Sequence, residues 1–250
     1  MVLLKDKEFV CIDVEATGLN PREDRVVEVA AMRFTLSDVL DEFESLVDPE
    51  CEIPICVQKV HHISQEMVQG QPKIRDLLPD LLEFVGSHTI VGHGISFDVE
   101  ILAEEARRAN IPYSLRDNCQ LDTLRLARLY GESPSNSLDV LRHHFNITAE
   151  GAHRAKNDVI VNIKVFRYLV KQFRTFEQVS KVLSKPILMK TMPLGKHKGR
   201  RLKEIPLSYL QWAVRQSFDQ DLIFSLQSEL RRRRKERDLS IAHNPFAHLL

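Results

Sequence analysis

Short runs of β-branched and aromatic residues dominate the first part of the chain and predict strands there. Three such runs occupy residues 8–17, 25–34 and 42–49. The links between these runs are short, and residues 18–25 (GLNPREDR) are turn-forming types, so antiparallel pairing is expected. A fourth apolar run at residues 88–94 predicts another strand, which follows a long helical stretch.

Longer stretches with apolar residues three and four positions apart predict amphipathic helices. Within the first of these stretches, residues 63–86, Ser64 is a candidate N-cap and Pro72 a candidate helix start. Residues 118–131 predict a short strand that turns directly into a helix. The other predicted helices are residues 63–86, 96–111, 136–147 and 153–173. This order of elements predicts an α/β fold in which a mixed β-sheet is flanked by helices.

The residue pattern changes past about Thr175, where Pro, Gly and basic residues cluster before a further helical stretch. A chain of 250 residues suits one large domain with a small appendage. We place the boundary near Lys185. The expected parts are a main domain over residues 1–180, a small basic C-terminal module over residues 186–238 and a tail over residues 239–250.

Charge and cysteine content narrow the class of protein. The 35 Lys and Arg residues balance 35 Asp and Glu residues, but two basic runs lie in the last quarter, at residues 195–203 and 231–237. Such runs are typical of nucleic-acid contact, although an arginine run also fits a solvated helix face. The four cysteines form no CxxC pair, so reduced, mostly buried thiols are expected. Without a signal peptide or an apolar span, we expect a soluble, cytoplasmic protein with no membrane partner.

Acidic residues at the ends of predicted elements are the strongest chemical signal. Asp13 and Glu15 end an apolar strand, although buried carboxylates are costly unless something positive lies beside them. Asp98 also fits a helix N-cap, and the helix dipole would favour Asp158. Acids at three separate places nevertheless favour a site for hard divalent cations, which take oxygen ligands. His153 lies five residues before Asp158 and has a side chain suited to accepting a proton from water.

Four motifs in this order resemble the DEDDh, or DnaQ-like, 3′–5′ exonuclease family. Its members include exonuclease X and the epsilon subunit of bacterial DNA polymerase III, and the resemblance is closest to these two. It runs from about Phe9 to Phe173, and the chain departs from the family pattern at Ala16, at His62 (usually Gly) and at Gly94 (usually Asn). The motifs are IDVEATGL, VQKVHHISQEM, VGHGISFDVEIL and HRAKNDVIVNIKVF.

The resemblance implies a ribonuclease H-like fold and a two-metal 3′–5′ exodeoxyribonuclease of DNA repair or proofreading, which releases nucleoside 5′-monophosphates from 3′ ends. The general base would be His153. Phe97, one of the implied substrate contacts given below, would also fit as a core aromatic at the start of a helix. The implied ligands of two Mg²⁺ or Mn²⁺ ions are Asp13, Glu15, Asp98 and Asp158. The implied substrate contacts are Thr17, Gly18, Leu19, His61 and Phe97.

The stretch MPLGKHKGRRLKEIPLSYLQWAV resembles a small module at the C-terminus of exonuclease X, with Leu194 in place of the usual Phe. The expected mini-core consists of Leu202, Ile205, Leu210 and Trp212. The candidate nucleic-acid contacts outside that core are Lys196, Lys198, Arg200 and Arg201. These cations also fit a purely solubilising role on a hairpin.

Two rival functions stay open at this point. A ribonuclease of the same fold would trim RNA ends, and the two substrates differ in the ribose 2′-OH, which no residue here decides. A non-catalytic nucleic-acid-binding protein is the other alternative, which the full set of acids and His153 disfavours. The expected partner is DNA with a 3′ end, single-stranded or duplex, with RNA as an alternative partner. Whether the chain forms a homodimer or binds a polymerase is open.

Overall fold

The computed structural model describes residues 2–112, 115–148, 154–216 and 218–242. The chain divides between Leu183 and Ser184 into two units, which are described separately below. Within the described ranges, no helix is both long enough and apolar enough to span a bilayer.

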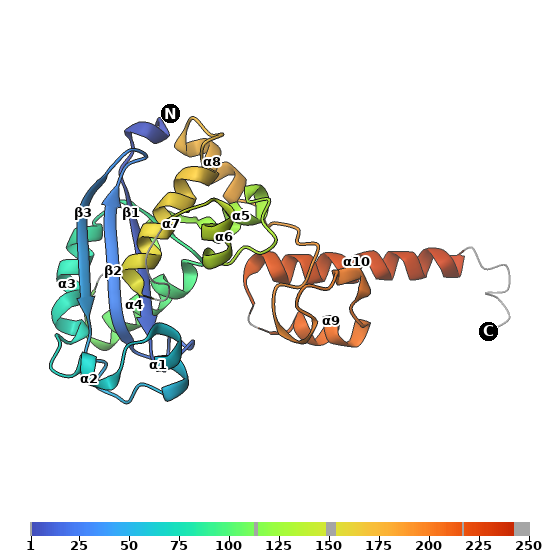
Figure 1. Ribbon diagram of the computed structural model, residues 1–250. Helices are drawn as coiled ribbons and strands as arrows, with labels where there is room; N and C mark the ends of the chain where they lie inside the picture. Colours follow the sequence, from blue (N-terminus) through green and yellow to red (C-terminus); the bar gives the residue numbers. More distant parts are fainter. Residues whose placement is uncertain (1, 113–114, 149–153, 217, 243–250) are drawn as a thin grey trace. The chain divides into compact units, whose positions relative to one another are not determined.

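The first unit is built around a sheet of five strands in the order β3-β2-β1-β4-β5 (Figure 1). The strands are β1 (Phe9–Ala16), β2 (Val26–Phe34), β3 (Val39–Leu46), β4 (Thr89–Gly92) and β5 (Gln120–Asp122). β1 pairs antiparallel with β2, and β2 with β3, whereas β1 and β4 are parallel, as are β4 and β5. The predicted α/β fold with a mixed sheet flanked by helices is therefore confirmed.

Helices cover both faces of this sheet (Figure 1). The helices of the first unit are α1 (Ile55–His61), α2 (Gln65–Val68), α3 (Ile74–Val85), α4 (Ser96–Arg108), α5 (Thr123–Tyr130), α6 (Leu138–His144), α7 (Ala155–Leu169) and α8 (Phe176–Leu183). Of these, α3 and α4 cover one face and α5 to α8 the other. Phe9 and Cys11 of β1 join the core under α5 to α8, while Val10, Ile12 and Val14 join the core under α3 and α4. Successive side chains of a strand point to opposite faces, so Asp13 and Glu15 belong to the α7 face.

The helix predicted over residues 63–86 is two helices, α2 and α3. Gly70 has φ of +77° and Pro72 follows it, so the backbone turns between the two helices and α3 begins only at Ile74. Ser64 does occupy the N-cap of α2, but its side chain caps no backbone N–H. The helix α1, before this segment, was not predicted.

The four cysteines form no disulfide, as expected, but their burial differs from the prediction. Cys11 is buried in β1, whereas Cys51, Cys56 and Cys119 are exposed. The expectation of mostly buried thiols is therefore wrong, because only Cys11 lies within a regular element of the sheet core.

The second unit contains two short 3₁₀ turns, Gly195–His197 and Leu202–Glu204, and the helices α9 (Leu207–Ala213) and α10 (Gln220–Ala242). Its core includes Met192, Leu202, Ile205, Leu210, Leu222 and Leu226. Trp212 was expected in this core but is 50% exposed. Residue 210 already fills the inward side of α9, and a residue two positions further along a helix points about 200° away from it.

The arginine run at residues 231–237 lies on α10, where three of its six cations, Arg232, Arg233 and Arg237, form salt bridges with acids of the same helix. Arg232 forms salt bridges with Glu229 and Glu236, and Arg233 forms one with Glu229. This fits the interpretation of a solvated helix face. The helix also continues through Leu239 to Ala242, residues that were expected to belong to the tail.

Candidate active site

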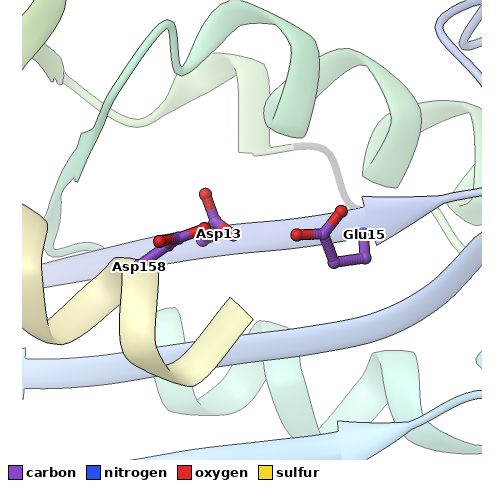
Figure 2. Close-up of side chains that lie close together, drawn as sticks. All are labelled: Asp13, Glu15 and Asp158. Atoms are coloured by element: carbon purple, nitrogen blue, oxygen red, sulfur yellow. The ribbon is translucent and has the colours of Figure 1, made fainter. Parts of the chain in front are cut away.

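Three carboxylates from two elements of the first unit gather in one place (Figure 2). Asp13 and Glu15 are two residues apart on β1 and therefore point to the same face of the sheet. Asp158 comes from the first turns of α7, which packs on that face. Each of the three offers an oxygen within 4.8 Å of those of the other two.

Asp98 approaches the same strand from the other side of the sheet. β1 pairs with β4 only over Phe9–Cys11, so the edge of β1 beyond Cys11 lacks a strand partner on that side. The Asp98 carboxylate accepts a hydrogen bond from the Val14 backbone N–H there, at 3.1 Å. Asp98 is not the N-cap of α4, since that position is Ile95. The N-cap alternative for Asp98 is therefore wrong.

Crowding and burial disfavour negative charge on these acids. Burial, followed by the charges of Asp98 and Asp158, raises the pKa of Asp13 well above its usual value. Burial and the charge of Asp158 raise the pKa of Glu15 to about 8. Burial also raises the pKa of Asp98 to about 7, against the hydrogen bond from Val14. A bound cation would reverse this balance by favouring the ionised forms.

The donor set fits a hard divalent cation. All the groups are carboxylate oxygens, the ligand type that Mg²⁺ and Mn²⁺ prefer, and no sulfur or imidazole belongs to the cluster of three. The cluster is half-buried rather than closed, so water and substrate oxygens can complete the coordination of an ion.

One ion pair beside the site, between Glu28 and Arg154, was not predicted from the sequence and holds the start of α7. Glu28 lies opposite Glu15 in the β1–β2 pair and is almost fully buried. It accepts hydrogen bonds from Arg154 Nη2 at 2.6 Å and from the Ala155 backbone N–H at 2.9 Å. Glu28 therefore satisfies the N-terminus of the helix that carries Asp158. The available signal was an acid within the otherwise apolar run VVEVAA.

The acids open into a pocket of about 440 Å³. Of the residues expected to touch substrate, four line it: Gly18, Leu19, His61 and Phe97. Leu19 is 88% exposed at its rim, in accord with a side chain that meets a ligand rather than the core. Phe97 is half-buried and also packs against the core under α3 and α4. Its position is therefore compatible both with a core aromatic and with a residue that faces the substrate.

Thr17 does not line the pocket, because its hydroxyl is already engaged. Thr17 Oγ1 donates to Asp24 Oδ1 at 3.0 Å and accepts from the Arg25 backbone N–H at 3.0 Å. Asp24 also crowds Gly18, since a Cβ on Gly18 would lie 2.5 Å from its carboxylate. Thr17 and Gly18 thus shape the loop that presents Leu19.

Only one of the two ring nitrogens of His61 has a hydrogen-bond partner among the described residues. Its Nδ1 accepts the Ile63 backbone N–H at 3.0 Å, so the proton of the neutral ring sits on Nε2. Nε2 is buried and has no hydrogen-bond partner among the described residues, and burial lowers the pKa of His61. The neighbouring His62 has φ of 60°, a left-handed conformation that favours Gly.

His153 falls outside the described residues, directly before Arg154. The four candidate nucleic-acid contacts belong to the second unit, in the segment around its two 3₁₀ turns: Lys196, Lys198, Arg200 and Arg201.

Comparison with known proteins gives two family matches and several relatives. Residues 10–166 match the model of the family described as "Exonuclease", and residues 180–226 match one described as "Putative quorum-sensing-regulated virulence factor". The chain is 32% identical over 170 residues to the DNA polymerase III subunit epsilon of Aquifex aeolicus (strain VF5), which covers 68% of this chain and 83% of that protein.

The chain is also 32% identical over 170 residues to the PolC-type DNA polymerase III of Clostridium perfringens (strain 13 / Type A). That match covers 68% of this chain but only 12% of the relative. The chain thus spans about one eighth of the length of the PolC-type relatives.

Solved structures share the fold at lower identity. A structure of exonuclease X with 5′ overhanging duplex DNA aligns with a TM-score of 0.57 and 23% identity, and covers 70% of this chain and 98% of that chain. A zinc-bound complex of E. coli exonuclease I with single-stranded DNA aligns with a TM-score of 0.62 and 21% identity, and covers 72% and 43%. Because the exonuclease model covers more than half of the chain and the epsilon relative most of its own length, the chain belongs to the DnaQ-like 3′–5′ exonuclease family.

Proposed function

We propose that this protein is a metal-dependent 3′–5′ exodeoxyribonuclease, which hydrolyses the terminal phosphodiester of DNA and releases nucleoside 5′-monophosphates. The observation that carries the proposal is the cluster of Asp13, Glu15 and Asp158 at the floor of a pocket, with Asp98 bonded to the same strand. Like-charged groups brought this close are stable together mainly as ligands of cations.

Asp13, Glu15, Asp98 and Asp158 would hold two Mg²⁺ or Mn²⁺ ions. When bound, such ions stabilise the attacking and the leaving oxygen of a phosphoryl displacement. His153 accepts the proton of the attacking water as general base. The pairing of Glu28 with Arg154 and Ala155 fixes the backbone next to His153 and the helix that carries Asp158.

The pocket supplies groups for the terminal nucleotide. Leu19 projects from the loop held by Thr17 and Asp24 and contacts the terminal base. His61 Nε2 donates to a phosphate or sugar oxygen, which would give this buried N–H the partner it otherwise lacks. Phe97 offers an apolar face beside Asp98.

DNA is proposed as the substrate because the relatives over 30% identical are DNA polymerase III proteins. The same relatives support the proposal of a role in DNA repair or proofreading in the cytoplasm. Nothing in the pocket favours RNA, and an exoribonuclease is therefore an outcome of the test rather than a second proposal.

The test is a nuclease assay on two 5′-labelled oligonucleotides of identical sequence, one DNA and one RNA, with Mg²⁺ or with EDTA. The expected result is a ladder from the 3′ end of DNA that requires Mg²⁺. Asp158→Ala abolishes the ladder, whereas Asp80→Ala, which changes an exposed acid of α3, leaves it intact. A ladder mainly on RNA would show that the substrate is RNA rather than DNA. The absence of a metal-dependent ladder on both oligonucleotides would overturn the catalytic proposal.

A further inference from the structure

The second unit exposes an aromatic pair on α9. Trp212 is 50% exposed, although a tryptophan normally contributes heavily to a core. Tyr209 lies one helical turn earlier, half-buried, and the two ring centroids are 5.2 Å apart. The core of this unit is complete without Trp212, because α9 buries Leu210 and Ala213 in it. The indole therefore packs on Tyr209 but leaves half of its surface open to a ligand.

A basic turn is packed against the same aromatic pair. The His197 ring meets Tyr209 edge-on, with centroids 4.4 Å apart. Gly195 lies so close that a Cβ there would be 3.0 Å from the Tyr209 hydroxyl oxygen. The turn Gly195–His197 thus rests on Tyr209, and it carries Lys196, with Lys198 directly after it.

Charge is strongly one-sided along the segment of chain that carries these rings. The acids between Lys190 and Gln216 number one, Glu204, against seven basic side chains. These are Lys190, Lys196, Lys198, Arg200, Arg201, Lys203 and Arg215. Lys196 and Lys198 are exposed and form no salt bridge with any residue that the structure describes. On α10, by contrast, Glu229 and Glu236 pair with Arg232 and Arg233.

The other two candidate cations have different surroundings. Arg200 lies 3.3 Å from His197 Nδ1 and donates to the Glu204 carbonyl at 3.2 Å, so it ties the turn together. Arg201 lines a separate cavity of about 670 Å³ with Lys190 and Lys203. Lys196 and Lys198 are therefore the exposed cations that flank His197, the residue of the turn that packs on Tyr209.

We propose that the second unit binds single-stranded nucleic acid, with bases stacked on Trp212 and Tyr209 and phosphates contacted by Lys196 and Lys198. Aromatic side chains beside cations are the usual platform for unpaired bases, because every base has a π-face and every nucleotide carries a phosphate. The excess of positive charge favours this ligand over a protein partner. The site needs none of the acids of the first unit and goes beyond the proposed hydrolysis.

The chain offers a direct probe, because Trp212 is its single tryptophan. The full chain is titrated with oligothymidylate in EDTA, where metal-dependent hydrolysis is absent, and tryptophan emission is followed. Stacking predicts saturable quenching that weakens as salt rises. Lys196→Gln with Lys198→Gln should weaken the titration and reduce the slope of log affinity against log salt by about 0.7 for each lost phosphate contact.

Matched variants and ligands decide the outcome. Arg234→Gln with Lys235→Gln removes two exposed cations of α10 and should leave the quenching unchanged. Heparin, a polyanion without bases, should quench far less than oligothymidylate; equal quenching would overturn the stacking. No quenching by oligothymidylate would overturn the site and leave a protein partner as the occupant of the exposed rings.

A second readout does not depend on tryptophan emission. Trp212→Leu should weaken binding of a labelled oligonucleotide in EDTA, and circular dichroism checks that the variant folds. Unchanged affinity would contradict the proposal. Failure of the nuclease assay would not affect either readout, because both are made without hydrolysis.

Discussion

The acid pocket of the first unit and the aromatic–basic surface of the second, made of Lys196, Lys198, Tyr209 and Trp212, use charge in opposite ways. In the pocket, Asp98 is buried and bonded to the Val14 backbone, and Asp13 faces further carboxylates. On the surface, the two lysines are exposed and the rings are partly open to solvent.

This difference separates chemistry from binding. Buried charges of one sign are costly and hold their geometry only when the fold enforces it, which is what a cation site requires. Exposed cations cost little and can follow a flexible backbone. The first arrangement suits a reaction at one bond, and the second suits retention of a strand without regard to sequence.

The strongest way to break this comparison is to remove one acid. Asp158→Asn should lower hydrolysis about a thousandfold, because loss of several kcal/mol of charge stabilisation costs tenfold per 1.36 kcal/mol. Single-turnover hydrolysis of labelled DNA measures it. Quenching of Trp212 by oligothymidylate should stay unchanged in the same variant, and a parallel loss would mean that the two regions are one site.

A smaller effect is expected from the pair that holds α7. Glu28→Gln should reduce the hydrolysis rate about 10- to 100-fold, as loss of a supporting contact to a metal site does. The concentration of Mg²⁺ at half-maximal rate should rise as well, a change that a general loss of stability would not produce. Lys156→Gln removes a surface ion pair with Glu42 and Glu44 at the same end of α7 and should change neither quantity.

The sheet, its flanking helices and the acids could be predicted because each has a local signal. A continuous apolar run, Phe9 to Ile12, marks β1, and Asp13 and Glu15 follow it where packing gives no reason for an acid. The three acids that cluster come from two motifs far apart in sequence, and the spacing of each motif within its element decides the face on which it lies. The catalytic role of each residue stays a prediction.

Other features depend on long-range contacts and could not be predicted. The partnership of Glu28 with Arg154 follows from how α7 docks on the sheet, which no local pattern encodes. The exposure of Trp212 follows from which face of a seven-residue helix the mini-core selects, and so short a helix leaves that choice ambiguous. The division of one predicted helix into two is different, because Gly70, with φ of +77°, and Pro72 are local signals within the sequence itself.

The crowding of the acids should lower the free energy of unfolding of the metal-free protein when they ionise. Because the pKa of Glu15 is raised to about 8, the folded protein binds that proton more tightly than the unfolded chain. Metal-free protein should therefore lose stability as pH rises from about 4.3 to about 8. At the upper end Glu15→Gln should raise the melting temperature by about 2–4 °C, the shift for 1 kcal/mol in a domain of this size.

Adding Mg²⁺ tests whether the same acids bind a cation. In scanning calorimetry, Mg²⁺ should raise the melting temperature of the wild-type first unit and have a weaker effect on Glu15→Gln. Glu42→Gln, an exposed acid of β3, is the control and should respond to Mg²⁺ like the wild type. A metal-free wild-type protein that gained stability toward alkaline pH would contradict the crowding of the acids.

The smallest effect tests how the basic turn rests on Tyr209. Gly195 and Gly199 both have left-handed φ, +72° and +80°, so an alanine at either costs about 1–2 kcal/mol of backbone strain. Only at Gly195 does the added Cβ also meet Tyr209, because nothing lies within 4 Å of one at Gly199. Gly195→Ala should therefore alter the emission of Trp212 and weaken quenching by oligothymidylate more than Gly199→Ala does. Equal effects would show that the contact with Tyr209 does not set the geometry of the surface, and binding would then depend on the lysines alone.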